Sequence, residues 1–363
     1  MTRRGTAALA ALLALLAGGA LPAQQPAAAP ALPAWTDAAT AAIEAAMGTA
    51  RIPGLSCTIG QDGELVYRRG FGLADVENDV PATSATVYRL GSISKPVTAV
   101  LAMQLAERGE LDLDRDVHTL VPEWPAKPWP VTTRQLLAHL GGVRHYQGEG
   151  ESTVHYATQV AGLVRFAGDP LRHEPGTRYL YSTYGYNLVA AVVEKVTAKP
   201  FAVLVRERIA VPCAAPTLQD DDVRRLVRGR AQGYIRRDGV LENSELMDNS
   251  YKLGGGGLCA SADDLARFAQ ALLAGRLVQP ATLAAMWTPQ KTTDGQIVDY
   301  ALGFRIGALG GRRTVHHGGA QARVSTFLLL LPEQRVVVAL LCNLEGIRLQ
   351  ALAEQLATAV LAG

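Results

Sequence analysis

The apolar positions change their spacing twice along the chain. Leu55–Ile59 and Leu65–Tyr67 flank the turn sequence Gln61–Gly63, which predicts a β-hairpin. From Ser92 the apolar residues recur three or four positions apart as far as Gly109, which predicts a helix. Strand-length apolar segments return only near the C-terminal end. Strands at both ends with helices between them favour an α+β fold, in which a mainly helical insertion interrupts one antiparallel sheet flanked by helices.

Other segments fit the same plan. Three more helices are expected, over residues 37–47, 132–140 and 185–196, and an amphipathic helix is expected over 349–361. Ser261 and Asp264 form a capping-box pattern before the helical stretch 265–273. The late strands are expected at 302–306, 314–317, 325–331 and 335–342. We therefore assign residues 35–90 and 250–363 to a sheet subdomain and 91–249 to a mainly helical subdomain.

The N-terminal segment is typical of a secretory signal. Arg3 and Arg4 precede an apolar stretch over residues 7–20, and Ala23 is a suitable cleavage residue. The apolar stretch is shorter than the roughly 20 residues that span a bilayer. We expect residues 1–23 to be a signal peptide and 24–34 an Ala/Pro-rich linker, so the mature chain is exported, periplasmic or secreted, without a stable membrane anchor. Whether the Arg pair directs twin-arginine export stays open.

Composition narrows the classes of partner. Without Arg3 and Arg4 the chain has 33 basic and 33 acidic residues, a balance that argues against nucleic-acid binding. The four cysteines lie far apart, without the short paired spacing of metal or redox sites, so we expect buried free thiols, no metal site and no cofactor. Disulfide pairing and oligomeric state stay open. The expected partner is a small-molecule or peptide substrate.

Ser92 and Lys95 are the first candidates for chemistry. They lie one turn apart at the start of the predicted helix, within mutual reach. A serine hydroxyl becomes a nucleophile when a base removes its proton, and a lysine amine is such a base once burial or a nearby positive charge lowers its pKa. Taken alone, the same four residues also fit a helix-capping serine followed by a surface lysine.

Two later motifs favour the catalytic interpretation of Ser92 and Lys95 over the helix-capping one. Tyr181–Thr183 precedes the predicted helix 185–196, and His316–Gly319 lies on a late strand. With Ser92–Lys95, they follow the order of the three motifs of the serine beta-lactamase and penicillin-binding protein superfamily, which the chain resembles. It is similar to the class C beta-lactamase-related branch and, within it, to the mitochondrial serine beta-lactamase-like proteins. The likeness covers roughly residues 40–345, with further support in residues 89–95, 133–140, 144–146 and 251–256.

The resemblance implies a beta-lactamase/transpeptidase-like fold and a catalytic set. Ser92 would attack a carbonyl carbon, and Lys95 and Tyr181 would share its proton. One backbone N–H of Ser92 and one of the strand residue aligned with Gly319 would hold the oxyanion. His316 would orient a substrate carboxylate or hydrogen-bond toward the tyrosine.

Substrate-binding residues complete the set implied by the resemblance: Thr183, His316, His317, Gly318 and Gly319. Thr183 replaces the asparagine of beta-lactamases, and His317 replaces the usual hydroxyl residue, so both weaken a beta-lactamase assignment. The resemblance leaves open whether His145 with Tyr146 lines the cleft, and Gly254–Gly257 is expected to serve close backbone packing near it.

The resulting interpretation is an exported serine hydrolase that forms an acyl-enzyme on Ser92 and cleaves peptide, amide or ester bonds. A true beta-lactamase or D-Ala-D-Ala carboxypeptidase is one alternative. A non-catalytic scaffold or binding protein that retains the fold is another, although it would have no physical need for the complete Ser92, Lys95 and Tyr181 set. The fold does not choose the substrate.

Overall fold

The computed structural model describes residues 33–146 and 153–363. The predicted signal peptide and all but the last residues of the predicted linker lie outside these ranges. Among the described helices, none combines the length and the apolar character that crossing a bilayer requires.

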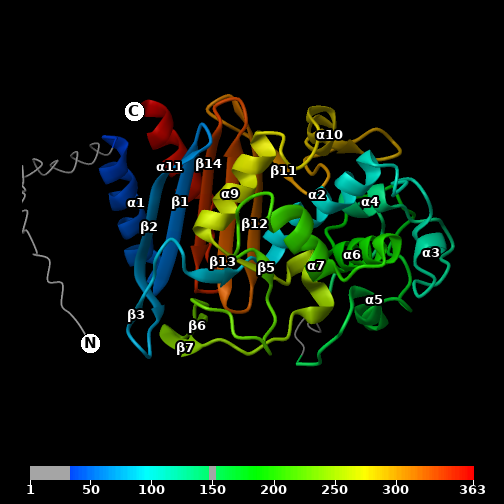
Figure 1. Ribbon diagram of the computed structural model, residues 1–363, viewed down its shortest axis with the longest axis horizontal. Coiled ribbons are helices and arrows are strands. Elements are labelled where there is room, and N and C mark those ends of the chain that lie inside the picture. Colours follow the sequence, from blue (N-terminus) through cyan, green and yellow to red (C-terminus); the bar gives the residue numbers. More distant parts are fainter. Residues whose placement is uncertain (1–32, 147–152) are drawn as a thin grey trace, which may run out of the picture. The chain divides into compact units, whose positions relative to one another are not determined.

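A seven-stranded antiparallel sheet organises the chain, in the order β11-β12-β13-β14-β1-β2-β3 (Figure 1). Early and late parts of the chain meet at its centre, where Leu55 of β1 lies opposite Cys342 of β14. The expected α+β class is confirmed. The strands are β1 (Gly54–Gln61), β2 (Glu64–Asp75), β3 (Val80–Pro81), β11 (Arg305–Leu309), β12 (Arg312–Gln321), β13 (Val324–Leu331) and β14 (Val336–Cys342).

Helices cover both faces of the sheet. The helices α1 (Trp35–Ala50) and α11 (Gln350–Ala362) pack on one face, against alternate residues of β13 such as Leu329 and Leu331. The helix α9 (Ala262–Leu273) and the helical region pack on the other face, where Leu328 lies. Because both faces are covered, the central strands read as continuous apolar runs.

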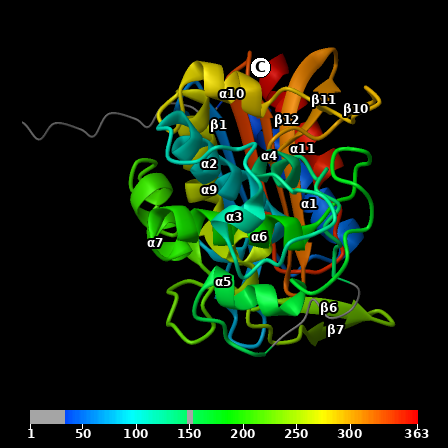
Figure 2. The same ribbon diagram turned by 90° about the vertical axis from the view of Figure 1, so that its right-hand side faces the viewer.

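The helical region lies beside the sheet in Figure 1 and in front of it in Figure 2. Its helix α2 is buried from Ser94 to Leu105, the polar residues Lys95 and Thr98 included, so it can carry polar side chains into the interior. The helices of this region are α2 (Ser94–Glu107), α3 (Val117–Leu120), α4 (Thr133–Leu137), α5 (Gln159–Gly162), α6 (Thr183–Thr197), α7 (Phe201–Val205) and α8 (Leu253–Gly256).

Smaller elements complete the fold. One three-stranded sheet, in the order β4-β8-β5, leads into the turn before α2. Two hairpins and a short helix lie further along the chain. These elements are β4 (Val87–Arg89), β5 (Gln219–Asp220), β8 (Leu258–Ser261), β6 (Tyr234–Arg237), β7 (Val240–Asn243), α10 (Pro280–Met286), β9 (Gln290–Lys291) and β10 (Ile297–Val298).

Most element predictions hold, with shifted boundaries. The hairpin around Gln61–Gly63 forms as expected, whereas the strand expected at 302–306 begins at Arg305. The helix expected from Ser92 starts as a 3₁₀ turn, Gly91–Ile93, before α2. The four cysteines are buried and unpaired, which confirms the expectation of free thiols.

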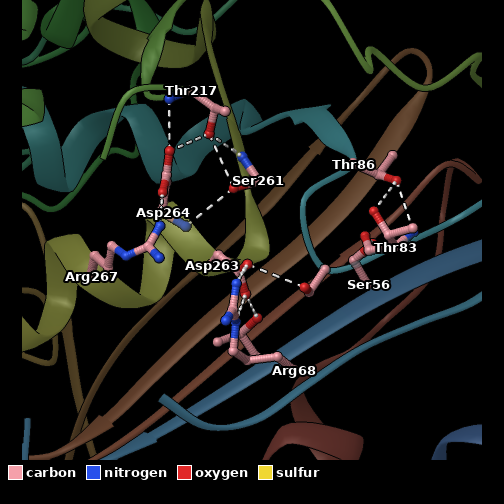
Figure 3. A network of polar contacts seen from close by, with 11 residues as sticks. Ser56, Arg68, Thr83, Thr86, Thr217, Ser261, Asp263, Asp264 and Arg267 are labelled. Atoms are coloured by element: carbon pink, nitrogen blue, oxygen red, sulfur yellow. Dashed lines mark hydrogen bonds and ion pairs between the residues drawn. The ribbon is translucent and has the colours of Figure 1, made fainter. Parts of the chain in front are cut away.

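The predicted capping box before α9 forms only by half. The Ser261 hydroxyl accepts a hydrogen bond from the Asp264 backbone N–H at 3.2 Å, as expected of an N-cap. The Asp264 carboxylate instead accepts from the Thr217 backbone N–H at 2.7 Å (Figure 3). The adjacent Asp263 accepts from Thr58 of β1 at 2.8 Å, which ties the start of α9 to the sheet.

Candidate active site

Ser92 lies in the 3₁₀ turn between β4 and α2, pressed against strand β12. Gly91 has a φ of +53°, and a Cβ placed there would lie 3.1 Å from the Ala320 backbone nitrogen. A Cβ on Gly319 would lie 2.1 Å from the Leu90 carbonyl oxygen, closer than any side chain tolerates. The two glycines therefore allow the backbones of the turn and the strand to meet beside the Ser92 hydroxyl.

Lys95 points from the first turn of α2 to the same hydroxyl. Its Nζ lies 3.0 Å from Ser92 Oγ, 3.2 Å from Thr183 Oγ1 and 2.7 Å from the Gly255 carbonyl oxygen. The side chain is fully buried. Burial, and then the positive charges of Lys252 and Arg305, hold the pKa of Lys95 well below its ordinary value. The site thus favours the neutral amine that a general base needs.

Tyr181 approaches from the residue before the N-cap of α6. Its ring centroid is 4.8 Å from Lys95 Nζ, and Tyr181 and Ser92 line the same pocket. Burial raises the pKa of Tyr181 well above the ordinary tyrosine range, although the Ser92 hydroxyl opposes that shift. The structure therefore brings Ser92, Lys95 and Tyr181 together, with the tyrosine as a neutral phenol.

The third motif enters the site through His317, not His316. Adjacent strand residues face opposite sides, and His317 lies on the inner face with its ring centroid 6.5 Å from that of Tyr181. His316 faces the other side and stacks on Phe327, with centroids 5.5 Å apart. This corrects the expectation that His316 orients the substrate.

His317 itself is buried and neutral. Its Nδ1–H donates to the Gly318 carbonyl at 2.7 Å, which leaves Nε2 to accept from the Tyr300 hydroxyl at 3.0 Å. Burial, followed by the charge of Lys95, keeps the pKa of His317 well below its ordinary value. The ring supports the wall behind Tyr181 and does not contact an incoming substrate, contrary to the expected substrate-binding role.

The hydrogen-bond alternation of β12 identifies the second oxyanion donor. Successive residues of a β-strand direct their backbone hydrogen bonds alternately to the strand on one side and to the strand on the other. The tight turn between β11 and β12 joins Leu309 and Arg312 by backbone hydrogen bonds. Even-numbered residues of β12 therefore hydrogen-bond to β11, and odd-numbered residues hydrogen-bond to β13. Gly319 N–H therefore faces β13. β11 begins only at Arg305, opposite His316, so it does not reach Ala320. The Ala320 nitrogen lies beside Gly91, next to Ser92, and its N–H is therefore the candidate donor, one position beyond the expected one.

A pocket of about 410 Å³ opens over Ser92 and Tyr181. Gly318 and Gly319 line it as expected, and so do His145 and Tyr146, whose position in the cleft the sequence left open. Thr183 does not line it: this residue is buried and bonds to Lys95, which corrects its expected contact with the substrate. Gly254 and Gly255 pack tightly against α6, as expected for the glycine run.

Two cations of the site escaped the sequence interpretation. Arg305 begins β11, is exposed, and lies 5.9 Å from the Tyr181 ring centroid. Lys252 is buried, with Nζ 5.6 Å from the ring centroid of Tyr146. Both come from parts of the chain that tertiary packing alone brings near Ser92. The one usable signal was the Tyr-Lys-Leu-Gly-Gly-Gly stretch that contains Lys252.

Comparison with known proteins places this geometry in a family. The family model described as Beta-lactamase matches residues 39–361. The chain belongs to the beta-lactamase family. It is 28% identical to the human mitochondrial serine beta-lactamase-like protein LACTB, covering 84% of this chain and 76% of that one. It is 29% identical to the esterase EstB of Burkholderia gladioli, covering 67% and 71%.

A solved structure agrees with these relatives. The octameric penicillin-binding protein homologue from Pyrococcus abyssi superposes with a TM-score of 0.79 at 27% identity, covering 90% of this chain and 77% of that one. The expected membership of the serine beta-lactamase and penicillin-binding protein superfamily, a superfamily of serine hydrolases, is confirmed.

Lys252 provides a direct test of the electrostatics around Lys95. Replacing Lys252 by Met removes a buried positive charge, so protonation of Lys95 becomes easier and its pKa rises. Because only the neutral amine can take a proton from Ser92, we expect the acid limb of kcat/KM to move to higher pH and the rate near neutral pH to fall. A pH–rate profile measures the shift. Lys252→Arg retains the charge, and an acid limb that moves as far in this variant would contradict the electrostatic explanation.

Proposed function

We propose that this chain is an exported serine hydrolase that forms an acyl-enzyme on Ser92 and hydrolyses peptide, amide or ester bonds. The observation that carries the proposal is the set of three oxygen atoms around Lys95 Nζ. A neutral amine donates to two of them and accepts the Ser92 proton on its lone pair. The resulting ammonium donates to all three.

Acylation follows from this arrangement. As the bond from Ser92 Oγ to the carbonyl carbon forms, the hydroxyl proton passes to Lys95. The carbonyl oxygen takes the electron pair and is held by the backbone N–H groups of Ser92 and Ala320. The faces of the Tyr181 and Tyr186 rings, 4.8 and 5.7 Å from Nζ, stabilise the new positive charge.

Departure of the leaving group uses the same residues. Tyr181, kept as a neutral phenol, donates its proton to the leaving atom and regains one from Lys95. Water then attacks the acyl-enzyme, with the proton movements reversed. The cycle returns Ser92, Lys95 and Tyr181 to their starting protonation states, so these residues need no metal or cofactor to complete it.

Arg305 supports a substrate with a carboxylate near the scissile bond. Among the described residues no carboxylate lies within ion-pair distance of its guanidinium, which is exposed beside Tyr181. The carboxylate role first expected for His316 suits this residue instead. Thr183, buried against Lys95, offers no amide to a beta-lactam side chain. Peptides and small esters therefore rank ahead of beta-lactams, and the relatives include an esterase and a D-aminopeptidase.

A covalent probe tests the proposal. The purified mature protein should be labelled by a fluorophosphonate, and Ser92→Ala should remove the label completely because the only proposed nucleophile is gone. Mass spectrometry of the labelled peptide identifies the modified residue. Equal labelling of both proteins would refute the assignment, and an unlabelled, folded wild-type chain would favour the non-catalytic scaffold.

Substrate class is tested on the same protein. A panel of a chromogenic cephalosporin, a p-nitrophenyl ester and a D-Ala-D-Ala peptide separates the enzyme types. The peptide is offered with a free and with an amidated C-terminus, and Arg305 should make the free acid the better substrate. Preference for the cephalosporin would instead support the beta-lactamase alternative. Export is tested separately, by N-terminal sequencing of the chain after secretion.

A further inference from the structure

We propose that His139 is a positioning residue that fixes Tyr181 against Ser92, through a hydrogen bond that only its unprotonated Nδ1 can accept. The inference rests on the proposed function, because Tyr181 needs an exact position only if it moves protons. His139 lies in the stretch 133–140 that supports the family resemblance, but the resemblance gives it no role in the site.

His139 holds the backbone on both sides of Tyr181. The backbone N–H of Leu180 donates to the His139 carbonyl oxygen at 2.9 Å. On the other side, the backbone N–H of Ser182 donates to His139 Nδ1 at 3.1 Å. One residue therefore fixes both peptide neighbours of the tyrosine. The start of α6 cannot shift or rotate about Tyr181 without breaking one of these bonds.

The imidazole also packs against the tyrosine ring. Its centroid lies 4.3 Å from that of Tyr181 and 4.4 Å from that of Tyr300, and the side chain is 2% exposed. Such close aromatic packing limits rotation of the phenol about its side-chain bonds. Contacts with the backbone and with the ring thus act on the same residue.

His139 lies in a backbone conformation that few non-glycine residues adopt. Its φ is +58°, in the left-handed region, which His and Asn tolerate better than most residues. This conformation turns the chain after α4, so that the carbonyl and the ring of one residue both reach the Tyr181 segment.

The hydrogen bond requires a neutral ring. A nitrogen that accepts from a backbone N–H carries no proton, so the ring's single proton is on Nε2. Burial, and then the positive charge of Lys95, hold the pKa of His139 well below its ordinary value, in agreement with the geometry. The ring can therefore serve as a fixed acceptor throughout the proton transfers on Ser92 and Lys95.

Two replacements separate the acceptor from the bulk of the ring. His139→Asn places an amide oxygen close to the position of Nδ1 and tolerates a positive φ, whereas His139→Leu fills space without an acceptor. The acylation rate should fall on the order of 10²-fold in His139→Leu, as expected when a reacting group is misplaced by about 1 Å, and at least tenfold less in His139→Asn. Substrate binding should change little in either.

A double-mutant cycle with Tyr181→Phe decides whether His139 acts through Tyr181. If it does, adding His139→Leu to Tyr181→Phe should cost less than threefold in acylation rate, since the phenol is already gone. This comparison holds even if His139→Leu lowers Tm. A similar comparison with His139→Asn applies if the leucine variant fails to fold. His118→Leu serves as the control. The His118 ring bonds to the Trp124 carbonyl and is remote from the site, so this variant should acylate normally.

The outcomes separate this inference from the proposed function. A folded wild-type chain that never acylates Ser92 removes the proposed function. Two results with an acylating wild-type chain would overturn the role of His139 and leave the proposed hydrolase intact. In one, His139→Leu acylates as fast as His139→Asn. In the other, His139→Leu costs as much with Phe at position 181 as with Tyr.

Discussion

Replacing Lys95 by Met should slow acylation of Ser92 by between about 10²- and 10⁴-fold. The methionine fills much of the buried volume but has no lone pair to take the serine proton. Tyr181 cannot replace it, because burial keeps its pKa well above the ordinary range and the phenol neutral. The time course of fluorophosphonate labelling measures the loss.

Lys199→Met is the matched control, since the Lys199 side chain lies on the surface and pairs with Glu207. This variant should label at the wild-type rate. If Lys95→Met retained more than a tenth of the wild-type rate, Lys95 would not be the base, and the proton would have to leave Ser92 by another route.

Gly319→Ala should disable the site by steric means alone. The added Cβ would lie 2.1 Å from the Leu90 carbonyl oxygen and 2.2 Å from Thr326 Oγ1, so β12 must move away from the Ser92 turn. That movement separates the N–H groups of Ser92 and Ala320, and losing one oxyanion donor costs about 10²- to 10³-fold in rate. The unfolding free energy should also fall by about 1–3 kcal/mol. Acylation kinetics and denaturant melts measure the two effects.

Gly48→Ala provides the comparison for the melts. Gly48 lies in α1, and a Cβ there meets nothing within 4 Å, so this variant should be as stable as the wild type or slightly more so. A Gly319→Ala protein with normal acylation would show that the strand and the turn can separate without harm, and the assignment of Ala320 as a donor would be lost.

Local sequence patterns predicted much of the fold and half of the site. The hairpin at Gln61–Gly63 and the helix α4 after Thr132 depend on neighbouring residues, so spacing and residue type predict them well. Ser92 and Lys95 are likewise one turn apart on one segment. Tyr181 is 86 residues beyond Lys95, and only the order of the three motifs predicted that it would join them.

The predictions that failed concern features that are set by pairing between distant segments of the chain. Sequence alone does not tell which of His316 and His317 faces inward, because the register of β12 against β13 sets it. The same register moves the oxyanion donor from Gly319 to Ala320. No local pattern gives Arg305 or His139 a role, since their roles arise from elements that packing brings to Tyr181.

The pairing of β1 with β14 has a consequence for how the protein is made. While a ribosome is still producing residues 336–342, the first strand lacks its neighbour and Ala320 is not yet held beside the serine turn. Contacts between segments so far apart form slowly. We therefore expect Ser92 to be unreactive until chain synthesis is complete. A product truncated before β14 should show no activity at all, not a reduced activity.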